Sequence, residues 1–589
     1  MINDFEPTYR LSDTLFEQAL TIIERSGAPE LIDNYYTQTK GPGGRPRRGT
    51  AYTIKAVLVC ALSLIMTGRT PSMKAILNTI GDLTPPQLAH VGMAGQDTSR
   101  IFGARDEQDR ERHRFTAWLS QRLQCLDSGL DQPARRITNH AHQQIVAART
   151  DEQRTRNQDA TERLRTVINR IVAGSIIDAH PEGAEGDLVA DESIFDLAST
   201  STGLGAKPDM NRGACYFGKY YSRARKSSPL RSEERNSTSA FGIGVTTITR
   251  IGRGEQLHLV PQVFVGMDIH EPTSGSVNAL RVAIEHMKRN GLDTRHANSR
   301  RWPLFTVDMG YSTKVLFSQL MLDNRYRGVF RYPEFWKLTE HTPPRDKTQP
   351  LPGPIQHAGA FYCPAAAHLL TGHRLPKTRD LLAANSWETH DRRLLSVLPF
   401  LMGTNSRPFL GKPRGRPRLG VTPQQSVKAE LVCPAVQRRV RCPLKPESME
   451  NTTFGLPLAE PAWKAHERTC CSQSSITINL SDEQFRKSQW GPVPGTWEHT
   501  LYFEAARSLT EQRFSMLKSP YITGLGAFNF GPRREPMVKI LLALAVAATN
   551  HRIQKTHASR ALREESIDIR WRQLRNRLGY EPARTPPRT

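Results

Sequence analysis

The feature that most restricts the fold of this chain is a series of short apolar, β-branched runs that starts near residue 185. Three of them follow one another, GDLVADESIFDL, FGIGVTTITRIG and QLHLVPQVFVGMD, and turn residues separate them, so we predict three consecutive strands. An amphipathic helix over 276–291 comes next, followed by a strand in WPLFTVDMGYS, a helix in TKVLFSQLMLDN and a strand in YRGVFRYP. The predicted order, β-β-β-α-β-α-β, indicates a mixed sheet with helices packed against it.

The rest of the chain divides by composition. A length of 589 residues is too great for one core and predicts about three or four folded units. Residues 1–175 have mostly helical periodicity, 346–490 are irregular with short strand candidates after a Pro-rich linker, and the helical signal returns over 495–557. The segment 558–589 is Arg-rich, and we expect it to be a loosely held basic tail.

The charge balance points to a polyanionic partner. The chain carries 81 Lys and Arg against 57 Asp and Glu, which gives a net charge of +24. Such an excess favours nucleic acid, because each phosphate that is neutralised releases counterions. The apolar runs are far shorter than the span of about 20 residues that crosses a membrane. No signal peptide is recognisable and the cysteines do not suggest a disulfide framework, so we expect a cytoplasmic protein with no membrane partner.

Charged residues at three places are candidates for one site. Asp191 ends the run DLVA and Asp308 ends PLFTV, and functional groups in open α/β sheets gather at the carboxyl ends of strands. A turn or N-cap residue is the plainer interpretation of either Asp alone. Further along, RSLTEQRFSMLK places Arg507, Glu511 and Lys518 on one face of a helix, since steps of four and seven residues nearly coincide in direction. Taken alone, this stripe is best explained as a surface ion pair.

Taken in order, the three segments resemble the motifs of the DDE transposases of bacterial insertion sequences. LVADES is similar to the first-Asp segment of that family, TVDMGYS to its second motif, and RSLTEQRFSMLK matches the Arg-x3-Glu-x6-Lys spacing of its third. Two positions depart from the pattern. Glu192 and Ser193 stand where the family often has Gly-Thr, and Glu504 stands where it usually has Tyr, the nearest tyrosine being Tyr502.

The resemblance implies an RNase H-like catalytic core, a mixed sheet formed by 185–345 and completed by the helices of 495–557. A minimal core of this kind needs far fewer residues between its second and third acids, so 346–490 is expected to be an inserted β-rich or irregular domain. The region 1–175 is then expected to be a helical DNA-binding region. The expected fold class is thus a multidomain α/β protein with a split core.

The same resemblance implies the roles of the charged residues. Asp191, Asp308 and Glu511 are the expected catalytic residues and the ligands of two Mg²⁺ ions, for which Mn²⁺ can substitute, with Asp191 bridging both. In-line attack on a phosphodiester needs an activated hydroxyl and a stabilised leaving oxygen, and two hard dications about 3.5–4 Å apart, held by carboxylates, supply both. Lys518 is expected to hold a DNA phosphate, and Arg507 either does the same or fixes the Glu511 rotamer.

The implied function is that of a transposase. Such a protein binds the terminal inverted repeats of its insertion sequence, cuts DNA strands with the help of metal ions, and joins 3′-ends to target DNA, here as a homodimer on DNA at the bacterial nucleoid. Two alternatives remain open. One is a catalytically inactive or domesticated DNA-binding descendant, for which Glu192 and Glu504 leave room, and the other is an RNase H-like endonuclease that cuts without joining.

Two basic segments resemble AT-hooks. Both GKPRGRPRLG and GGRPRRG contain a Gly-Arg-Pro-Arg core, in which Pro keeps the chain extended, Gly permits close approach and Arg seeks the negative potential of a narrow minor groove. The alternative is a basic loop that contacts phosphates without reading the base sequence. For the first segment the AT-hook and this alternative are equally supported, and for the second the basic loop is favoured. The predicted DNA-binding arginines are Arg414, Arg416 and Arg418 in the first and Arg45, Arg47 and Arg48 in the second.

The inserted segment also holds candidates for a zinc site, namely Cys433, Cys442, His466 and Cys470, with Cys471 beside them. Their spacing lacks the tight Cys-x2-Cys pair of recognisable zinc sites, so buried thiols are the default interpretation. Two tryptophans, Trp490 and Trp497, precede the Glu511 helix. Core packing is their expected role, and holding a flipped base is the alternative.

Overall fold

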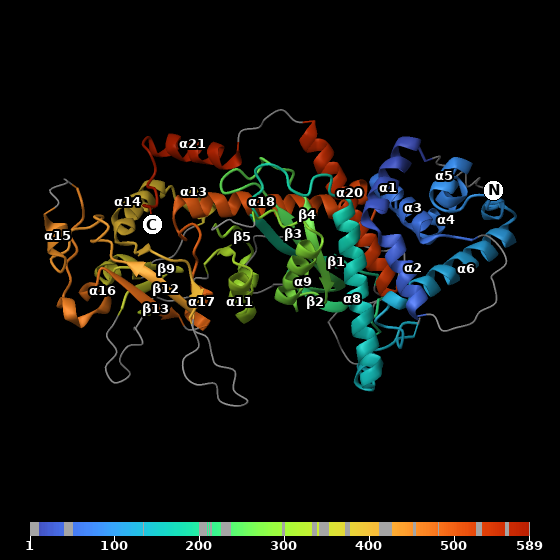
Figure 1. Cartoon of the computed structure of the whole chain (residues 1–589), viewed down its shortest axis with the longest axis horizontal. Helices are drawn as coiled ribbons and strands as arrows, with labels where there is room; N and C mark the ends of the chain where they lie inside the picture. The colour runs from blue at the N-terminus through green and yellow to red at the C-terminus, as the bar shows by residue number, and fades with distance from the viewer. Residues whose placement is uncertain are drawn as a thin grey trace.

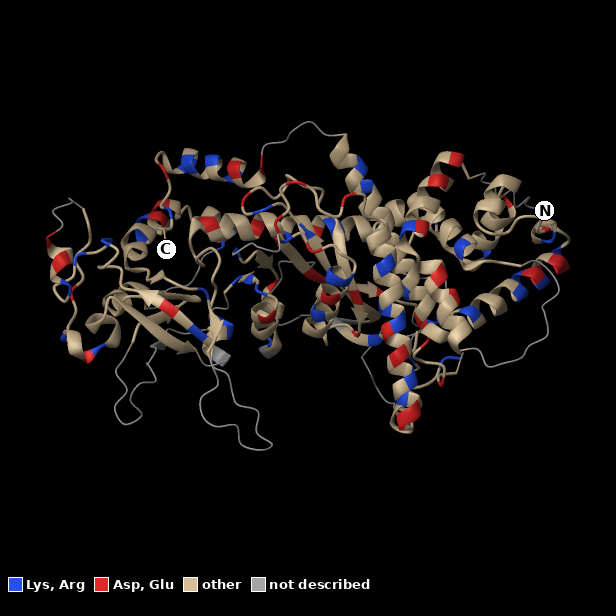
Figure 2. Cartoon of the chain, in the orientation of Figure 1, with Lys and Arg blue, Asp and Glu red and all other residues tan. Residues whose placement is uncertain are grey.

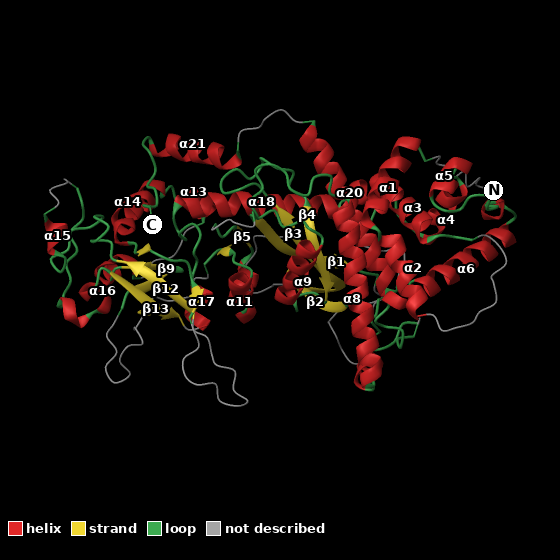
Figure 3. Cartoon of the chain, in the orientation of Figure 1, coloured by secondary structure: helices red, strands yellow, loops and turns green. Residues whose placement is uncertain are grey.

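The computed structural model describes residues 11–39, 51–133, 135–198, 209, 211–212, 215–224, 237–296, 301–332, 339–340, 353–371, 377–411, 427–450, 455–480, 482–525, 533–559 and 565–587. These residues form a mixed α/β protein with several sheets. The molecule is elongated, with the N-terminal helices at one end, the largest sheet in the middle and the segment that follows it at the other end (Figure 1). Figure 3 shows the strands confined to the middle and to the end opposite the N-terminus.

The N-terminal region is helical, as predicted. Its helices are α1 (Asp13–Ser26), α2 (Ala28–Thr39), α3 (Ile54–Met66), α4 (Met73–Gly81), α5 (Pro85–His90), α6 (Arg105–Arg122), α7 (Asn139–Ala147) and α8 (Asp151–Gly174). Helix α3 is apolar on all sides and almost entirely buried, and Thr53 caps its N-terminus by accepting a hydrogen bond from the Ala56 amide.

Helix α20 (Glu535–Ala558) ties this region to the rest of the chain. It packs against α3 and α8, and its residues share one hydrophobic core with the N-terminal helices and with the first four strands of the main sheet. The sequence predicts a largely buried helix here. Helix α20 comes from the C-terminal part of the chain, and its partners are N-terminal helices and strands of the main sheet, so the N-terminal region and the sheet are packed as one unit through α20.

The main sheet contains β1 (Leu188–Asp196), β2 (Lys219–Ala224), β3 (Ser237–Arg250), β4 (Phe264–His270), β5 (Leu304–Thr306) and β6 (Arg327–Val329). Strand β1 is central: β3 pairs with it antiparallel on one side, and β5 pairs with it parallel on the other, followed by β6. Both β2 and β4 pair antiparallel with the long β3. The predicted strands are all present, and β2 was missed because KYYSRA is polar and lacks an apolar run.

Helices cover both faces of this sheet. The face that contains Leu188, Ala190 and Phe305 packs against α9 (Ser276–Arg289) and α11 (Val315–Asp323). The opposite face, with Val189 and Leu304, packs against α18 (Trp497–Lys518). Because successive residues of a strand point to opposite faces, Asp191 shares the α18 face with Val189.

The segment between the sheet and α18 contains two smaller sheets and short helices. One sheet has β12 (Val427–Val432) at its centre, paired with β13 (Ser475–Leu480), β10 (Gly403–Thr404) and β11 (Phe409–Leu410); the other has β7 (Thr339–Glu340), β8 (Ile355–His357) and β9 (Ala360–Tyr362). The helices are α12 (Ala367–Leu370), α13 (Thr378–Ala383), α14 (Trp387–Val397), α15 (Pro446–Met449), α16 (Thr469–Ser472) and α17 (Asp482–Lys487). The prediction of short strands is confirmed, whereas α14 was not foreseen.

The expectation of a loosely held tail after residue 558 is wrong for the described part. Helix α21 (Ser566–Leu578) buries Leu574 and Leu578 in a cluster that includes Trp387 and Trp497. The sequence is Arg-rich because most of the helix surface faces solvent, but its apolar residues lie on one side and pack. None of the helices in the described ranges is long and apolar enough to cross a membrane.

Candidate active site

Asp191 and Asp308 lie at the same level along two neighbouring parallel strands. The prediction that both stand at strand ends is wrong for Asp191, which lies inside β1, whereas Asp308 lies two residues past the end of β5. The register pairs Val189 of β1 with Thr306 of β5, and each Asp follows its partner of that pair by two residues. The Asp191 Oδ1 accepts a hydrogen bond from the Glu192 amide, 2.9 Å away. Asp308 is the N-cap of the short helix α10 (Met309–Ser312), and its Oδ1 accepts from the Met309 amide at 2.8 Å. The N-cap interpretation of Asp308 is therefore correct, and it leaves the second carboxylate oxygen available.

Helix α18 brings Arg507 and Glu511 to this edge of the sheet. Its apolar side, which includes Tyr502 and Leu509, packs on the face that carries Val189. The Arg507 guanidinium lies close to all three predicted acids. Its Nη1 is 3.7 Å from Asp191 Oδ2 and 3.6 Å from Asp308 Oδ1, and its Nε is 3.5 Å from Glu511 Oε1. The structure thus gathers the three carboxylates around one cation.

The three acids differ in exposure. The Asp191 side chain is 14% exposed, that of Asp308 46% and that of Glu511 64%. Burial raises the pKa of Asp191 to about 6, and the neighbouring Asp308 and Glu511 add to the rise, whereas Arg507 and the Glu192 amide oppose it. A buried carboxylate with like charges beside it and a raised pKa has the character of a functional group.

The donor set suits a hard divalent cation, because it consists of carboxylate oxygens that open to solvent on the Glu511 side. As the side chains lie, no three His, Cys, Asp or Glu residues within the described ranges stand close enough together to hold a metal ion. Arg507 is instead the cation among the acids.

This electrostatic arrangement predicts a dependence of stability on pH in the metal-free protein. The folded pKa of Asp191 lies above its usual value, so the folded state binds the proton more tightly, and stability decreases as pH rises from about 4 to about 6. Asp191→Asn removes this titration. We expect the free energy of unfolding of the variant, relative to wild type, to increase by on the order of 2 kcal/mol between pH 4 and pH 7.

Denaturant unfolding of both proteins without divalent cations, at several pH values, checks this expectation. Other carboxylates that titrate in the same pH range contribute equally to both proteins, so their contributions cancel in the difference between the two free energies of unfolding. A difference that does not change with pH contradicts the raised pKa.

Beneath the acids lies a buried polar chain that the sequence did not reveal. The Tyr311 hydroxyl is 3.3 Å from Thr246 Oγ1, which is 2.9 Å from His270 Nε2, and His270 Nδ1 is 2.7 Å from the Ser274 carbonyl. With Nδ1 as the donor to the carbonyl, Nε2 accepts from Thr246, and Thr246 accepts from Tyr311. Burial raises the pKa of Tyr311 well above its ordinary value, so it stays a neutral donor. The Gly-Tyr pair in the second motif was the only sequence signal for it.

Two residues that depart from the family pattern have structural contacts. Glu192 accepts hydrogen bonds from the Thr273 amide and the Ser276 hydroxyl, at the N-terminus of α9, where a carboxylate also complements the helix dipole. Glu504 accepts from the Thr378 hydroxyl at 2.7 Å and pairs with Arg570 of α21 at 3.4 Å. Both side chains connect separate elements, so each residue that departs from the family pattern has a structural role of its own.

Lys518 is predicted to contact a DNA phosphate, and in the structure its side chain contacts β1. Its Nζ donates to the Ile194 carbonyl at 2.6 Å and lies 5.1 Å from the centre of the Phe195 ring. The end of α18 is thereby fastened to β1 just beyond Asp191.

The remaining predictions have mixed outcomes. All six AT-hook arginines, Arg45, Arg47, Arg48, Arg414, Arg416 and Arg418, lie outside the described residues. Trp497 is completely buried, and Trp490 packs against Phe361, so core packing is the role that the contacts support. Of the zinc candidates, the cysteines gather around one cavity whereas His466 is exposed and does not line it.

No protein-family model matches the chain, and neither the curated proteins nor the solved structures contain a match.

Figure 2 shows basic and acidic residues interspersed over the described elements, for example along α8, and not separated into two faces. The site geometry itself therefore carries the functional argument.

Proposed function

We propose that the chain is a DDE transposase that cuts DNA strands at the ends of an insertion sequence and joins them to target DNA, with divalent metal ions as cofactors. The observation that carries this proposal is the convergence of three acids around Arg507. Its guanidinium lies within 4 Å of Asp191, Asp308 and Glu511, which three separate sequence motifs had singled out.

The sheet supports an RNase H-like core. Apart from β2 and the one-turn helix α10, the elements follow the order β1, β3, β4, α9, β5, α11 and β6, with α18 after the inserted segment. β3 pairs antiparallel with both β1 and β4, whereas β5 pairs parallel with β1 and β6 pairs parallel with β5. Acids on the first strand, just after the fourth and on a late helix agree with the order of the family's catalytic residues.

In this proposal Asp191, Asp308 and Glu511 hold the metal ions. When bound, the ions would activate the attacking hydroxyl and stabilise the leaving oxygen. Asp191 is the most buried of the three and is held by the Glu192 amide, so its carboxylate has the most fixed direction. Arg507 neutralises part of the like charge among the acids and orients Glu511 through the i,i+4 pair.

The test is a cleavage and strand-transfer assay with the full chain. Linear duplexes whose ends come from the DNA that flanks its coding sequence are incubated with Mg²⁺, with Mn²⁺, or with a chelator. We expect nicks at the element ends and joined products with either metal and neither product with the chelator. Nicks without joined products on pre-cut 3′-ends would instead identify an endonuclease.

A second candidate is a DNA-binding protein that has lost catalysis. The close approach of Arg507 to all three acids favours it, because a guanidinium can stabilise clustered carboxylates without metal. Tight DNA binding without cleavage on any duplex, in Mg²⁺ or Mn²⁺, would support this candidate and overturn the transposase.

A further inference from the structure

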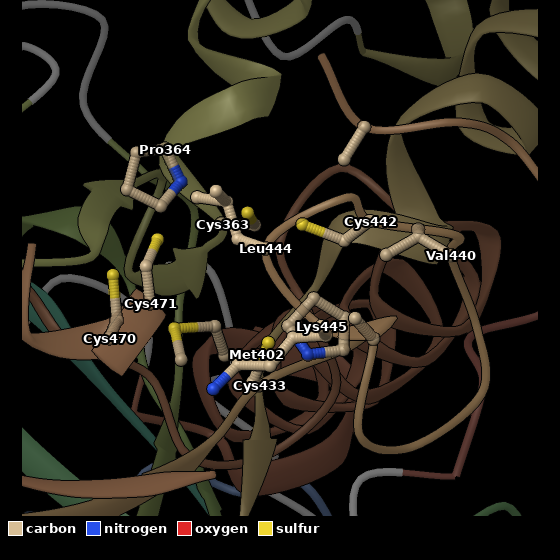
Figure 4. Close-up of a pocket in the computed structure, with 13 residues that line it drawn as sticks. Cys363, Pro364, Met402, Cys433, Val440, Cys442, Leu444, Lys445, Cys470 and Cys471 are labelled. Atoms are coloured by element: carbon tan, nitrogen blue, oxygen red, sulfur yellow. The ribbon is translucent and has the colours of Figure 1, made fainter. Parts of the chain in front are cut away.

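Five cysteines line one small cavity in the segment between the main sheet and α18. They are Cys363, Cys433, Cys442, Cys470 and Cys471, and the cavity has a volume of about 20 Å³. Figure 4 shows them around the same opening, with Cys363 and Cys442 on one side and Cys470 and Cys471 on the other. All five carry free thiols.

The cysteines reach this cavity from distant parts of the chain. Cys363 follows β9, Cys433 follows β12, Cys442 lies in the loop after it, and the adjacent pair belongs to α16. The other cysteines of the chain, Cys60, Cys125 and Cys215, lie apart from one another in the sequence and belong to the core around α20. Buried thiols that act only as small apolar groups would not need to converge.

The surroundings of Cys471 favour a thiolate. Its Sγ accepts a hydrogen bond from the Trp463 indole N–H at 3.3 Å, and Lys445 lines the same cavity. The Cys470 thiol also donates to it, and Arg468 lies 4.3 Å from the centre of the Trp463 ring, so donors and cations surround this sulfur. The thiols of Cys363, Cys433 and Cys442 line the same cavity. A cation held among the four sulfurs would offset the repulsion between their thiolates.

We propose that Cys363, Cys433, Cys442 and Cys471 bind one Zn²⁺ ion as a structural site. Sulfur ligands in an apolar setting suit a thiophilic dication and not the oxygen-seeking Mg²⁺, and four protein ligands make a closed, tetrahedral site. The sulfurs do not meet at metal-binding distance as they lie. They surround a cavity into which they can turn, and Zn–S bonds of about 2.3 Å would draw them inward.

This ligand set differs from the one that the sequence suggested. Cys363 takes the place of His466, and Cys471 takes the place of its neighbour. Cys470 acts as the donor to Cys471, and both side chains belong to the apolar cluster that contains Ile476 and Phe485. The site would join four segments of the inserted region, so it does not depend on the proposed catalytic function.

Metal analysis of the full chain tests the proposal. Protein purified without chelators, with Zn²⁺ in the medium, is expected to contain one zinc per chain by elemental mass spectrometry. Replacement by Co²⁺ is expected to give the sulfur-to-cobalt absorption of a tetrahedral thiolate site. Thiol titration of the native protein should release four additional reactive thiols when a strong chelator removes the metal.

Variants locate the ligands. Cys363→Ser, Cys433→Ser, Cys442→Ser and Cys471→Ser should each lose the bound zinc, whereas Cys470→Ser and the distant control Cys125→Ser should keep one ion per chain. Loss of zinc in Cys470→Ser would overturn this ligand set. If a ligand variant fails to fold, the zinc stoichiometry and the cobalt spectrum of the wild-type protein still show whether the site exists. Absence of metal after exposure to Zn²⁺, or disulfides among the five cysteines, would overturn the site.

Discussion

Replacement of Asp191 by Asn is expected to lower the rate of DNA strand cleavage by about a thousandfold or more, with little change in DNA affinity. Asn has the same shape and keeps an oxygen that can accept from the Glu192 amide, so the local fold should be preserved. It removes the charge of the most buried acid among the three that surround Arg507. The rate of nicking at saturating enzyme, compared with the dissociation constant for the same duplex, separates the two effects.

Matched variants make this result specific. Asp308→Asn and Glu511→Gln should have comparable effects, because both acids approach the same guanidinium. Asp323→Asn is the control, since that exposed residue ends α11 and accepts a hydrogen bond from Gln319 of its own helix. Cleavage by Asp191→Asn within tenfold of wild type contradicts a catalytic role for this acid, even if the protein proves to be a nuclease.

The sequence predicted the strands of the main sheet well because their apolar runs are strong local signals. It also singled out Asp191 and Asp308, because each follows an apolar run, although Asp191 lies inside β1 and only Asp308 lies beyond the end of its strand. What brings them to one level is the register of Val189 with Thr306, a tertiary property that local patterns only suggest. The position of Arg507 among three acids, and not beside Glu511 alone, likewise depends on how α18 packs across the sheet.

Other features had no local signal. His270 and Thr246 lie on adjacent strands and meet Tyr311 only in the folded sheet. Cys363 lies more than a hundred residues before Cys471, so spacing rules for zinc sites could not include it. In the C-terminal segment, the abundance of arginine concealed the helical spacing of Ile567, Leu574 and Leu578, which bury their side chains in α21.

Trp497 offers the largest expected change in stability. It is completely buried at the start of α18, where its ring stacks on Trp387 at 5.7 Å and its indole N–H donates to Asp391 Oδ1 at 2.8 Å. The same Asp391 oxygen accepts from the Ala583 amide at 2.8 Å. Trp497 and Asp391 thus connect α18, the inserted segment through α14, and the C-terminal stretch after α21.

Trp497→Ala is expected to reduce the free energy of unfolding by about 4 kcal/mol, because it leaves a cavity and removes a donor from a buried carboxylate. Trp497→Phe should lose less, since it keeps most of the packing and only the hydrogen bond is absent. The control is Trp571→Ala, whose partly exposed indole donates to the exposed Glu581, with an expected loss of about 1 kcal/mol. Denaturant unfolding measures the loss in free energy of unfolding for each of the three variants, and the rate of proteolysis between α14 and α18 provides a second ranking of their stabilities. Equal losses of unfolding free energy for Trp497→Ala and Trp571→Ala would contradict this expectation. They would show that Trp497 does not couple the three segments, so that packing on the sheet is what positions α18.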